Sequence, residues 1–314
     1  MQLQTTLPLS PATRPIDYKS RTVLLGSCFT EHIGDKLAYY QFRNYSNPLG
    51  IYYHPKAIET LLDRIIEDRP FGAADVFEYE EQWHSYEAHS RLSQLSEKAL
   101  LRTLNERLSE TRDYLISASH IFLTLGTAWG YRLKDTGKWV ANCHKVPQKE
   151  FSKELLGVDE IETCLQHILG MIRELNPEAQ VVFSISPVRH LKDGFVENQR
   201  SKAHLIAAVH GAIQEGKAAY FPAYELFMDE LRDYRFYGED LVHPNALAVG
   251  YIWEKFRQVW ISEGISGIMQ KVSDIRRGLA HRPFNPESTA HKKFQTTLND
   301  QIEQLKQEYP FMEF

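Results

Sequence analysis

The sequence predicts an α/β fold: a five-stranded parallel sheet, doubly wound, with helices on both faces in a three-layer α/β/α arrangement. The first observation behind this prediction is that short β-rich runs alternate with helical patterns along the chain, which is typical of parallel sheets. The second is that the runs at 121–125 and 181–185 read IFLTL and VVFSI. Such nearly continuous apolar runs are typical of strands that are buried on both faces.

The expected elements alternate in chain order. Strands are predicted at residues 22–25, 42–45, 121–125, 181–185 and 219–221. Helices are predicted at residues 31–40, 54–68, 97–117, 161–175, 197–215 and 246–262. Pro55 supports the start of the second helix, because proline is well tolerated in a first helical turn.

Two segments and the carboxyl-terminal region depart from this alternation. Residues 75–95 are partly alternating and rich in histidine and aromatic residues, and a turn at 135–137 between two alternating runs predicts a hairpin. We expect both as insertions at the rim of the sheet. Residues 276–288 are expected to form a loop, and 289–307 a polar helix with a sparse apolar stripe. The predicted organisation is an α/β domain at 1–264 and a helical extension at 265–314 packed on it.

Composition excludes several classes of function. The chain has 314 residues and a net charge of -5, with no run of basic residues that would favour nucleic acid as a partner. We expect no membrane association, because no stretch of about 18 apolar residues exists, and the first twenty residues do not resemble a signal peptide. Three cysteines are too few for a disulfide framework, so reduced thiols in a cytoplasmic protein are expected. The sequence predicts no cofactor and leaves the oligomeric state open.

The first strand ends in a segment suited to nucleophilic catalysis. Ligands of doubly wound sheets bind beyond the carboxyl ends of the strands, and Gly26, Ser27 and Cys28 follow the first strand there. The helix that comes next has unpaired N–H groups and a partial positive charge, which lower a thiol pKa and can hold an oxyanion. Ser27 and Cys28 are therefore the candidate nucleophiles, and we expect the pKa of Cys28 to lie below its usual value.

A second candidate motif precedes the last helix of the sheet domain. Asp240 and His243 form an Asp-x-x-His pair. At this spacing a carboxylate can fix the tautomer of an imidazole, and the ring can then accept a proton from a nucleophile. We expect this pair to lie at the same rim as Cys28.

Further candidates for oxyanion or substrate contacts lie at other strand ends and on the insertions. Arg189 has the charge to bind an acidic substrate, and Asn142 has an amide that can donate to an oxyanion. The complete set of these candidates is Gly50, Gly126, Asn142, His144, Arg189 and His89.

These motifs carry a resemblance to known families. Residues 25–31, LGSCFTE, and residues 240–243, DLVH, resemble the first and last blocks of the SGNH (GDSL-like) hydrolases. A closer resemblance is to the GSCFA family, a bacterial group similar to a divergent SGNH branch, with Thr30 where the family name has alanine. The segments NPLG, LGTAW, NCHKVP, SPVRH and DLVHP extend it over about residues 20–260. The resemblance implies a flavodoxin-like fold and hydrolysis or transfer of an ester, with carbohydrate or cell-envelope esters suggested by analogy.

The register of the first block decides which residue is the nucleophile. The unslipped alignment places Cys28 at the nucleophile position, and a slip of one residue would place Ser27 there; Phe29 and Thr30 favour the unslipped register. The third block departs from the SGNH pattern, because Ala128 stands where those enzymes have an oxyanion-holding asparagine. Loss of one such donor typically costs about 10²–10³ in rate. Asn142 is the candidate replacement.

The sequence is also compatible with two other functions. Without the asparagine, the chain could be a non-catalytic SGNH-like domain that binds a small molecule or a glycan. A metal centre would draw on Cys28, Cys143, His144 and His243, which are ligand types for zinc. No two of them have the spacing of a paired-ligand motif, so no metal is expected.

Overall fold

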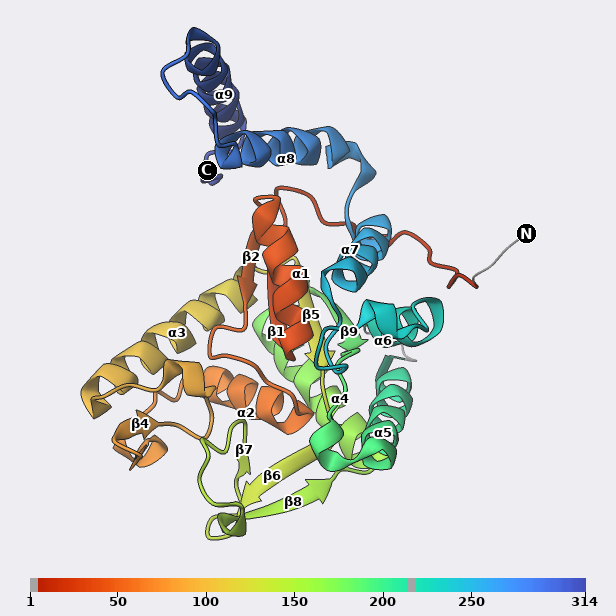
Figure 1. Ribbon diagram of the computed structural model, residues 1–314. Coiled ribbons are helices and arrows are strands. Elements are labelled where there is room, and N and C mark those ends of the chain that lie inside the picture. The colour runs from red at the N-terminus through yellow and green to blue at the C-terminus, as the bar shows by residue number, and fades with distance from the viewer. Residues whose placement is uncertain (1–4, 214–217) are drawn as a thin grey trace.

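The computed structural model describes residues 5–213 and 218–314, and a five-stranded parallel sheet forms its centre (Figure 1). The strand order is β10-β9-β5-β1-β2. In chain order the strands are β1 (Arg21–Gly26), β2 (Arg43–Ser46), β5 (His120–Leu125), β9 (Gln180–Ile185) and β10 (Ala219–Phe221). The predicted α/β class and parallel sheet are confirmed. The first four residues of the amino-terminal segment and residues 214–215 of the expected fifth helix lie outside the described residues.

Helices cover both faces of the sheet. One face packs against α1 (Cys28–Tyr39) and α7 (Ala246–Trp260). The other packs against α2 (Pro55–Ile66), α3 (Glu97–Ser117), α4 (Val158–Leu175) and α5 (Phe195–Ile213). Successive residues of a strand point to opposite faces of the sheet. Ile121 and Leu123 therefore pack against α2, α3, α4 and α5, and Phe122 packs against α1 and α7. None of the described helices is both long and apolar enough to cross a bilayer.

Two small antiparallel sheets lie at the rim. The strands β3 (Phe77–Tyr79) and β4 (Gln82–His84) form one hairpin. The expected second hairpin consists of β6 (Trp129–Leu133) and β7 (Trp139–Val140), and β8 (Phe151–Leu155) adds a third strand that was not predicted. Short turns of helix complete the connections: η1 (Ala73–Asp75), η2 (Ser90–Leu92), η3 (Gln148–Glu150), η4 (Leu191–Asp193), α6 (Ala223–Glu225), the π-helical η5 (Leu226–Glu230), η6 (Tyr234–Phe236) and η7 (Glu263–Ile265).

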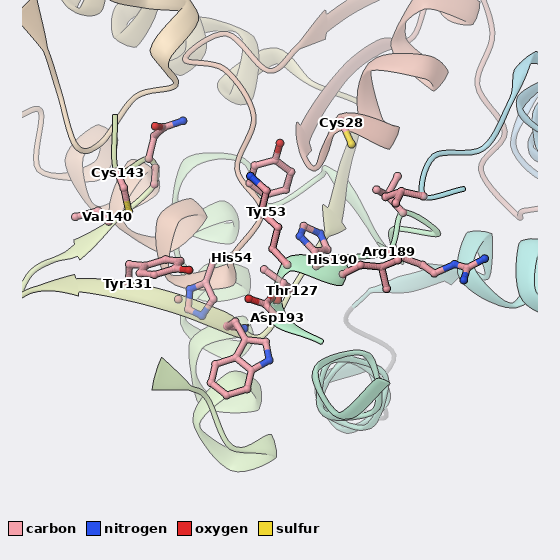
Figure 2. A pocket seen from close by; sticks show the side chains of 18 of the residues that line it. Cys28, Tyr53, His54, Thr127, Tyr131, Val140, Cys143, Arg189, His190 and Asp193 are labelled. Carbon is pink, nitrogen blue, oxygen red and sulfur yellow. Dashed lines mark hydrogen bonds between the residues drawn. The ribbon is translucent and has the colours of Figure 1, made fainter. Parts of the chain in front are cut away.

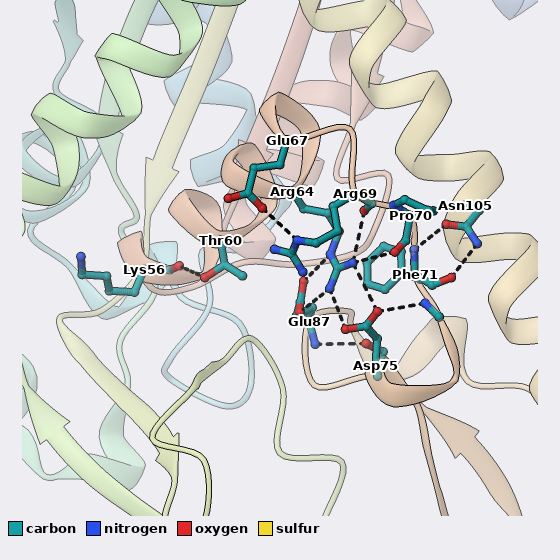
Figure 3. Close-up of polar contacts among 12 residues, drawn as sticks. Lys56, Thr60, Arg64, Glu67, Arg69, Pro70, Phe71, Asp75, Glu87 and Asn105 are labelled. Atoms are coloured by element: carbon teal, nitrogen blue, oxygen red, sulfur yellow. Dashed lines mark hydrogen bonds and ion pairs between the residues drawn. The ribbon is translucent and has the colours of Figure 1, made fainter.

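A buried arginine on α2 binds the first insertion, residues 75–95, through ion pairs and hydrogen bonds (Figure 3). Arg64 on α2 is fully buried and donates to Asp75 at 2.9 Å and to Glu87 at 2.7 Å. Its guanidinium also donates to the carbonyl oxygens of residues 69 and 70 and stacks over Phe71 at 4.0 Å. A charge out of contact with water requires such a set of partners. The insertion is therefore held at a fixed position against α2, beside the rim of the sheet.

The carboxyl-terminal region contains α8 (Ser266–Ala280) and α9 (Thr289–Glu308). Helix α8 was not predicted, and its last turn falls where a loop was expected at 276–288. Three buried residues at helical spacing, Met269, Val272 and Ile275, explain why a helix forms there. In Figure 1, α8 and α9 lie at the top of the view, above α1 and β2, and the chain end returns so that Arg43 stacks over Phe311 at 4.1 Å.

Candidate functional site

A pocket of about 650 Å³ opens at the carboxyl ends of the parallel strands (Figure 2). Its wall is built from the first residue of α1, the loops that follow β2, β5 and β9, the hairpin strands β6 and β7, and the loop before α7. This is the place where doubly wound folds bind their ligands.

The turn between β1 and α1 sets the position of Cys28. Gly26 has a φ of 141°, and a Cβ on this residue would lie 2.1 Å from the carbonyl oxygen of Thr124. The Gly26 N–H donates to the side chain of Asn47 at 2.9 Å, and the Ser27 N–H donates to Thr124 O at 2.9 Å. Glycine is thus required at this turn, and the turn makes Cys28 the first residue of the helix.

The two adjacent candidate nucleophiles have different surroundings. Ser27 is 0% exposed, lies outside the pocket lining, and its Oγ has no hydrogen-bond partner among the residues that the structure describes. Cys28 is half-buried and lines the pocket. The backbone N–H groups of Cys28 and Phe29 favour the thiolate form of the Cys28 side chain over the thiol. The thiol therefore faces the pocket and the hydroxyl does not line it.

The expected low pKa of Cys28 was wrong. Burial raises the pKa of this thiol, and the nearby carboxylate of Glu31 raises it further. Lys202 and the N–H groups at the start of α1 lower it, but by less. The sequence showed the helix terminus but not the loss of solvent around the sulfur, which disfavours the charged form.

The Asp240–His243 pair forms as the spacing suggested. His243 Nδ1 donates to Asp240 Oδ2 at 2.6 Å, and Asp240 Oδ1 accepts from the backbone N–H groups of Val242 and His243 at 2.9 and 3.0 Å. These bonds hold the pKa of the Asp240 carboxyl well below its usual range. With its proton on Nδ1, His243 has Nε2 free to accept one. The loop is attached to the site by the N–H of Arg189, which donates to Val242 O at 3.4 Å.

Cys28, Asp240 and His243 all line the pocket. The His243 side chain is 47% exposed. In the described part of the chain no hydrogen bond joins His243 to the Cys28 thiol. Catalytic hydrogen bonds are often long in the absence of substrate and shorten only when it binds.

Four of the other sequence candidates lie outside the pocket lining. The N–H groups of Gly50 and Gly126 are already used, because they donate to Asn47 O and Tyr53 O at 2.9 and 2.8 Å. His89 caps η2 and packs against Gly50. His144 is buried, with Nε2 2.7 Å from the Ser85 carbonyl oxygen. All four residues thus bond to or pack against other parts of the protein and do not face the pocket.

Asn142 and Arg189 do line the pocket. The Asn142 side-chain oxygen accepts from the His144 N–H at 2.8 Å, so its amide nitrogen is the end available to a ligand. The Arg189 guanidinium lies over the ring of Tyr237 at 4.1 Å. Figure 2 shows it directed away from His190. Arg189 is thus held by an aromatic ring, and its charge is not directed at Cys28.

Sequence reasoning missed two ionisable residues of this region: His190, which lines the pocket, and Lys202, which donates to the carbonyl oxygens of Gly126 and Ser186. His190 contacts Tyr53 edge-on at 5.4 Å, and burial lowers the pKa of His190 to about 3. Its Nε2 has no hydrogen-bond partner among the described residues. Lys202 on α5 is fully buried. The signal for Lys202 was its place on the apolar stripe of α5 with Leu205 and Val209, where a charge is unusual.

The proposed metal ligands do not come together. Within residues 5–213 and 218–314 no group of three or more histidine, cysteine and acidic side chains could hold a metal ion. Figure 2 places Cys28 and Cys143 at opposite ends of the pocket, on different sides of Tyr53.

The fold and the pocket define a doubly wound α/β protein with a thiol and an Asp–His pair at the carboxyl ends of its sheet. The family model of the GSCFA family matches residues 21–256, and that of the GSCFA domain protein, C-terminal domain, matches residues 272–314. The chain therefore belongs to the GSCFA family, as its motifs suggested.

None of the curated proteins compared matches the chain. Among solved structures, the chain is similar to an acetyl xylan esterase (Est2A) from the rumen bacterium Butyrivibrio proteoclasticus, with 10% sequence identity and a TM-score of 0.38. The match covers 84% of this chain and 66% of that one, slightly less than two thirds of its length.

Proposed function

We propose that this protein hydrolyses an ester or transfers its acyl group, with Cys28 as the nucleophile and His243 as the general base. The observation that supports this proposal is that the Cys28 thiol and the Asp240–His243 pair line a single pocket. Asp240 orients the ring, since its carboxylate accepts the Nδ1 proton and leaves Nε2 to act as the base.

The reaction proceeds in two steps. The Cys28 thiol gives its proton to His243 Nε2, and the sulfur attacks the carbonyl carbon of the ester. The tetrahedral intermediate collapses as the alcohol leaves with the proton from His243, and a thioester on Cys28 remains. Water or an acceptor hydroxyl then gives a proton to His243 and attacks the thioester, and the acyl product departs as Cys28 regains its proton.

The oxyanion is held by the start of α1. The backbone N–H groups of Cys28 and Phe29 lie at the helix N-terminus beside the sulfur. Such donors are set before the reaction begins and need no reorganisation. Ala128 is fully buried and has no side-chain donor. Asn142 lines the same pocket but precedes Cys143, which Figure 2 places at the other end, so the N–H groups at the start of α1 are the donors that we propose.

An ester of a sugar is the substrate class that we propose. The wall of the pocket combines the aromatic rings of Tyr53, Trp129 and Tyr131 with the polar side chains of Asn142 and Gln148. Aromatic faces with a few placed polar groups suit a ligand that has both apolar and hydroxyl-bearing faces.

The test is the intact mass of the protein after incubation with p-nitrophenyl acetate, p-nitrophenyl butyrate and a peracetylated sugar. We expect an increment of one acyl group on Cys28, located by peptide mapping, and none in Cys28→Ala. Turnover of any of these esters that persists in Cys28→Ala would overturn the proposal. Absence of both acylation and turnover with all three would favour a binding domain instead.

A further inference from the structure

We propose that Lys202 is a positioning residue of this site, a buried cation that stabilises the thiolate of Cys28 from beneath the pocket. The inference rests on the proposed function in taking Cys28 as the nucleophile. It adds a residue from α5, an element that supplies none of the candidate catalytic groups.

The ammonium of Lys202 is held at the carboxyl ends of two central strands. Its side chain is 1% exposed, and Nζ donates to the carbonyl oxygens of Gly126 and Ser186, both at 2.7 Å. These residues directly follow β5 and β9. Two carbonyl oxygens at this distance accept from a cation and fix its position in the wall of the site.

This charge has no carboxylate partner in the described part of the chain, and its other neighbour is the ring of Tyr224, whose centroid lies 5.7 Å from Nζ. An ammonium group has three N–H donors, and the two carbonyl oxygens take only two of them. A buried, unpaired cation is costly, and burial lowers the pKa of Lys202 to about 7. An anion close to the third N–H would remove this cost, which points to a negatively charged neighbour during the working cycle.

Cys28 is the neighbour that can supply the charge. The Ser27 N–H donates to Thr124 O, and Lys202 Nζ donates to Gly126 O two residues further on, so the start of α1 and the ammonium are both bonded to the carboxyl end of β5. The electrostatic interaction acts on both groups: Lys202 lowers the pKa of Cys28, and Cys28 raises that of Lys202. The buried ammonium thus offsets part of the cost that burial imposes on the thiolate.

Other titratable groups face this pair. Glu31 on α1 acts against the thiolate. Tyr53 after β2 interacts with Cys28, and His190 after β9 interacts with Lys202. None of these neighbours supplies a positive charge to the sulfur at neutral pH, because burial keeps His190 neutral. His243 lies at the exposed side of the pocket and interacts with His190.

The experiment measures the rate of Cys28 alkylation by iodoacetamide from pH 6 to 10 in the wild-type chain and in Lys202→Met, read by peptide mass spectrometry. We expect the rate below pH 7, where Lys202 keeps its proton, to fall at least about tenfold in Lys202→Met, and the difference between the two proteins to shrink as the pH rises above 7. This corresponds to about 1.36 kcal/mol of lost thiolate stabilisation. The alkylation rate is measured without a substrate. The role of Lys202 is therefore tested separately from ester turnover.

The matched control is Ser201→Ala, next to Lys202 on α5. It removes the hydroxyl that bonds to Thr127 and to the Ala128 N–H, without changing a charge. This variant should keep the wild-type profile for Cys28. The profile of Cys143, at the far end of the pocket, should be the same in all three proteins. Equal Cys28 profiles in folded Lys202→Met and wild type would overturn the proposal.

A reciprocal measurement covers the case in which Lys202→Met does not fold. The wild-type chain and Cys28→Ala are labelled with ¹³C at the lysine ε-carbon, and the resonance that titrates far below the usual lysine range of about 10.4 is followed with pH. Because coupling is reciprocal, loss of the thiol should lower the titration midpoint of this resonance. An unchanged midpoint would overturn the proposal.

Discussion

His54 gives a stability prediction whose size follows from its surroundings. This residue caps α2, with Nδ1 accepting from the Lys56 N–H at 3.2 Å and Nε2 3.2 Å from Ala128 O. It is 6% exposed and stacks on Trp139 at 5.1 Å. Burial lowers the pKa of His54 to about 3. Both nitrogens are engaged by the neutral ring, so protonation would break the bond at Nδ1.

The sign and size of the effect follow from linkage. The unfolded chain takes up a proton on His54 near pH 6.5 and the folded chain does so only near pH 3, so the free energy of unfolding falls as pH drops through this interval. Between pH 7 and pH 5 the equilibrium constant for unfolding rises by about 1.5 powers of ten, so the free energy of unfolding falls by about 2 kcal/mol at 1.36 kcal/mol per power of ten. This part of the pH dependence of stability should disappear when the His54 ring is removed.

The variant His54→Asn keeps a good helix cap but removes the titrating ring. At pH 7 we expect it to be less stable by about 1–2 kcal/mol, because the bond to Ala128 is lost. Urea unfolding should show that this difference closes or reverses at pH 5, a change of about 2 kcal/mol between the two pH values. The control Ile58→Val, on the same helix, should lose about 0.5–1.5 kcal/mol equally at both pH values. A gap between wild type and His54→Asn that does not change with pH would refute the reasoning.

Three further predictions concern the site. Cys28→Ala should abolish turnover and acylation while Ser27→Ala keeps at least part of the activity; the opposite pattern in an ester assay would show that the hydroxyl is the nucleophile. His243→Ala should remove most of the activity without unfolding the chain, and Asp240→Asn should cost less. Unchanged pH–rate profiles in both would exclude the acid–base role. Gly26→Ala should lower the free energy of unfolding by more than about 1 kcal/mol, because the residue has a positive φ and its Cβ would meet Thr124 O. A thermal melt equal to that of the wild type would contradict this account of the turn.

Local pattern was enough for the elements that carry strong periodicity. The continuous apolar runs gave β5 and β9, and the turn at 135–137 gave the hairpin of β6 and β7. Helix α8 and strand β8 were missed, since each has a short or polar-rich pattern and is stabilised by packing against other parts of the chain. Burial of Met269 and Val272 is what makes α8 a helix, and that burial is a tertiary fact.

The sequence by itself determined the fold class, the family, and the presence of a thiol and an Asp-x-x-His pair at strand ends. These depend on short-range features: periodicity, a glycine turn, and residues three apart that can bond to one another, as Asp240 and His243 do. Only the tertiary structure decided that Cys28 faces the pocket while Ser27 is buried, and that burial raises the thiol pKa. It also brought Lys202 to the site from a distant helix. Solvent exclusion and contacts between distant segments depend on packing of the whole chain, which no local pattern encodes.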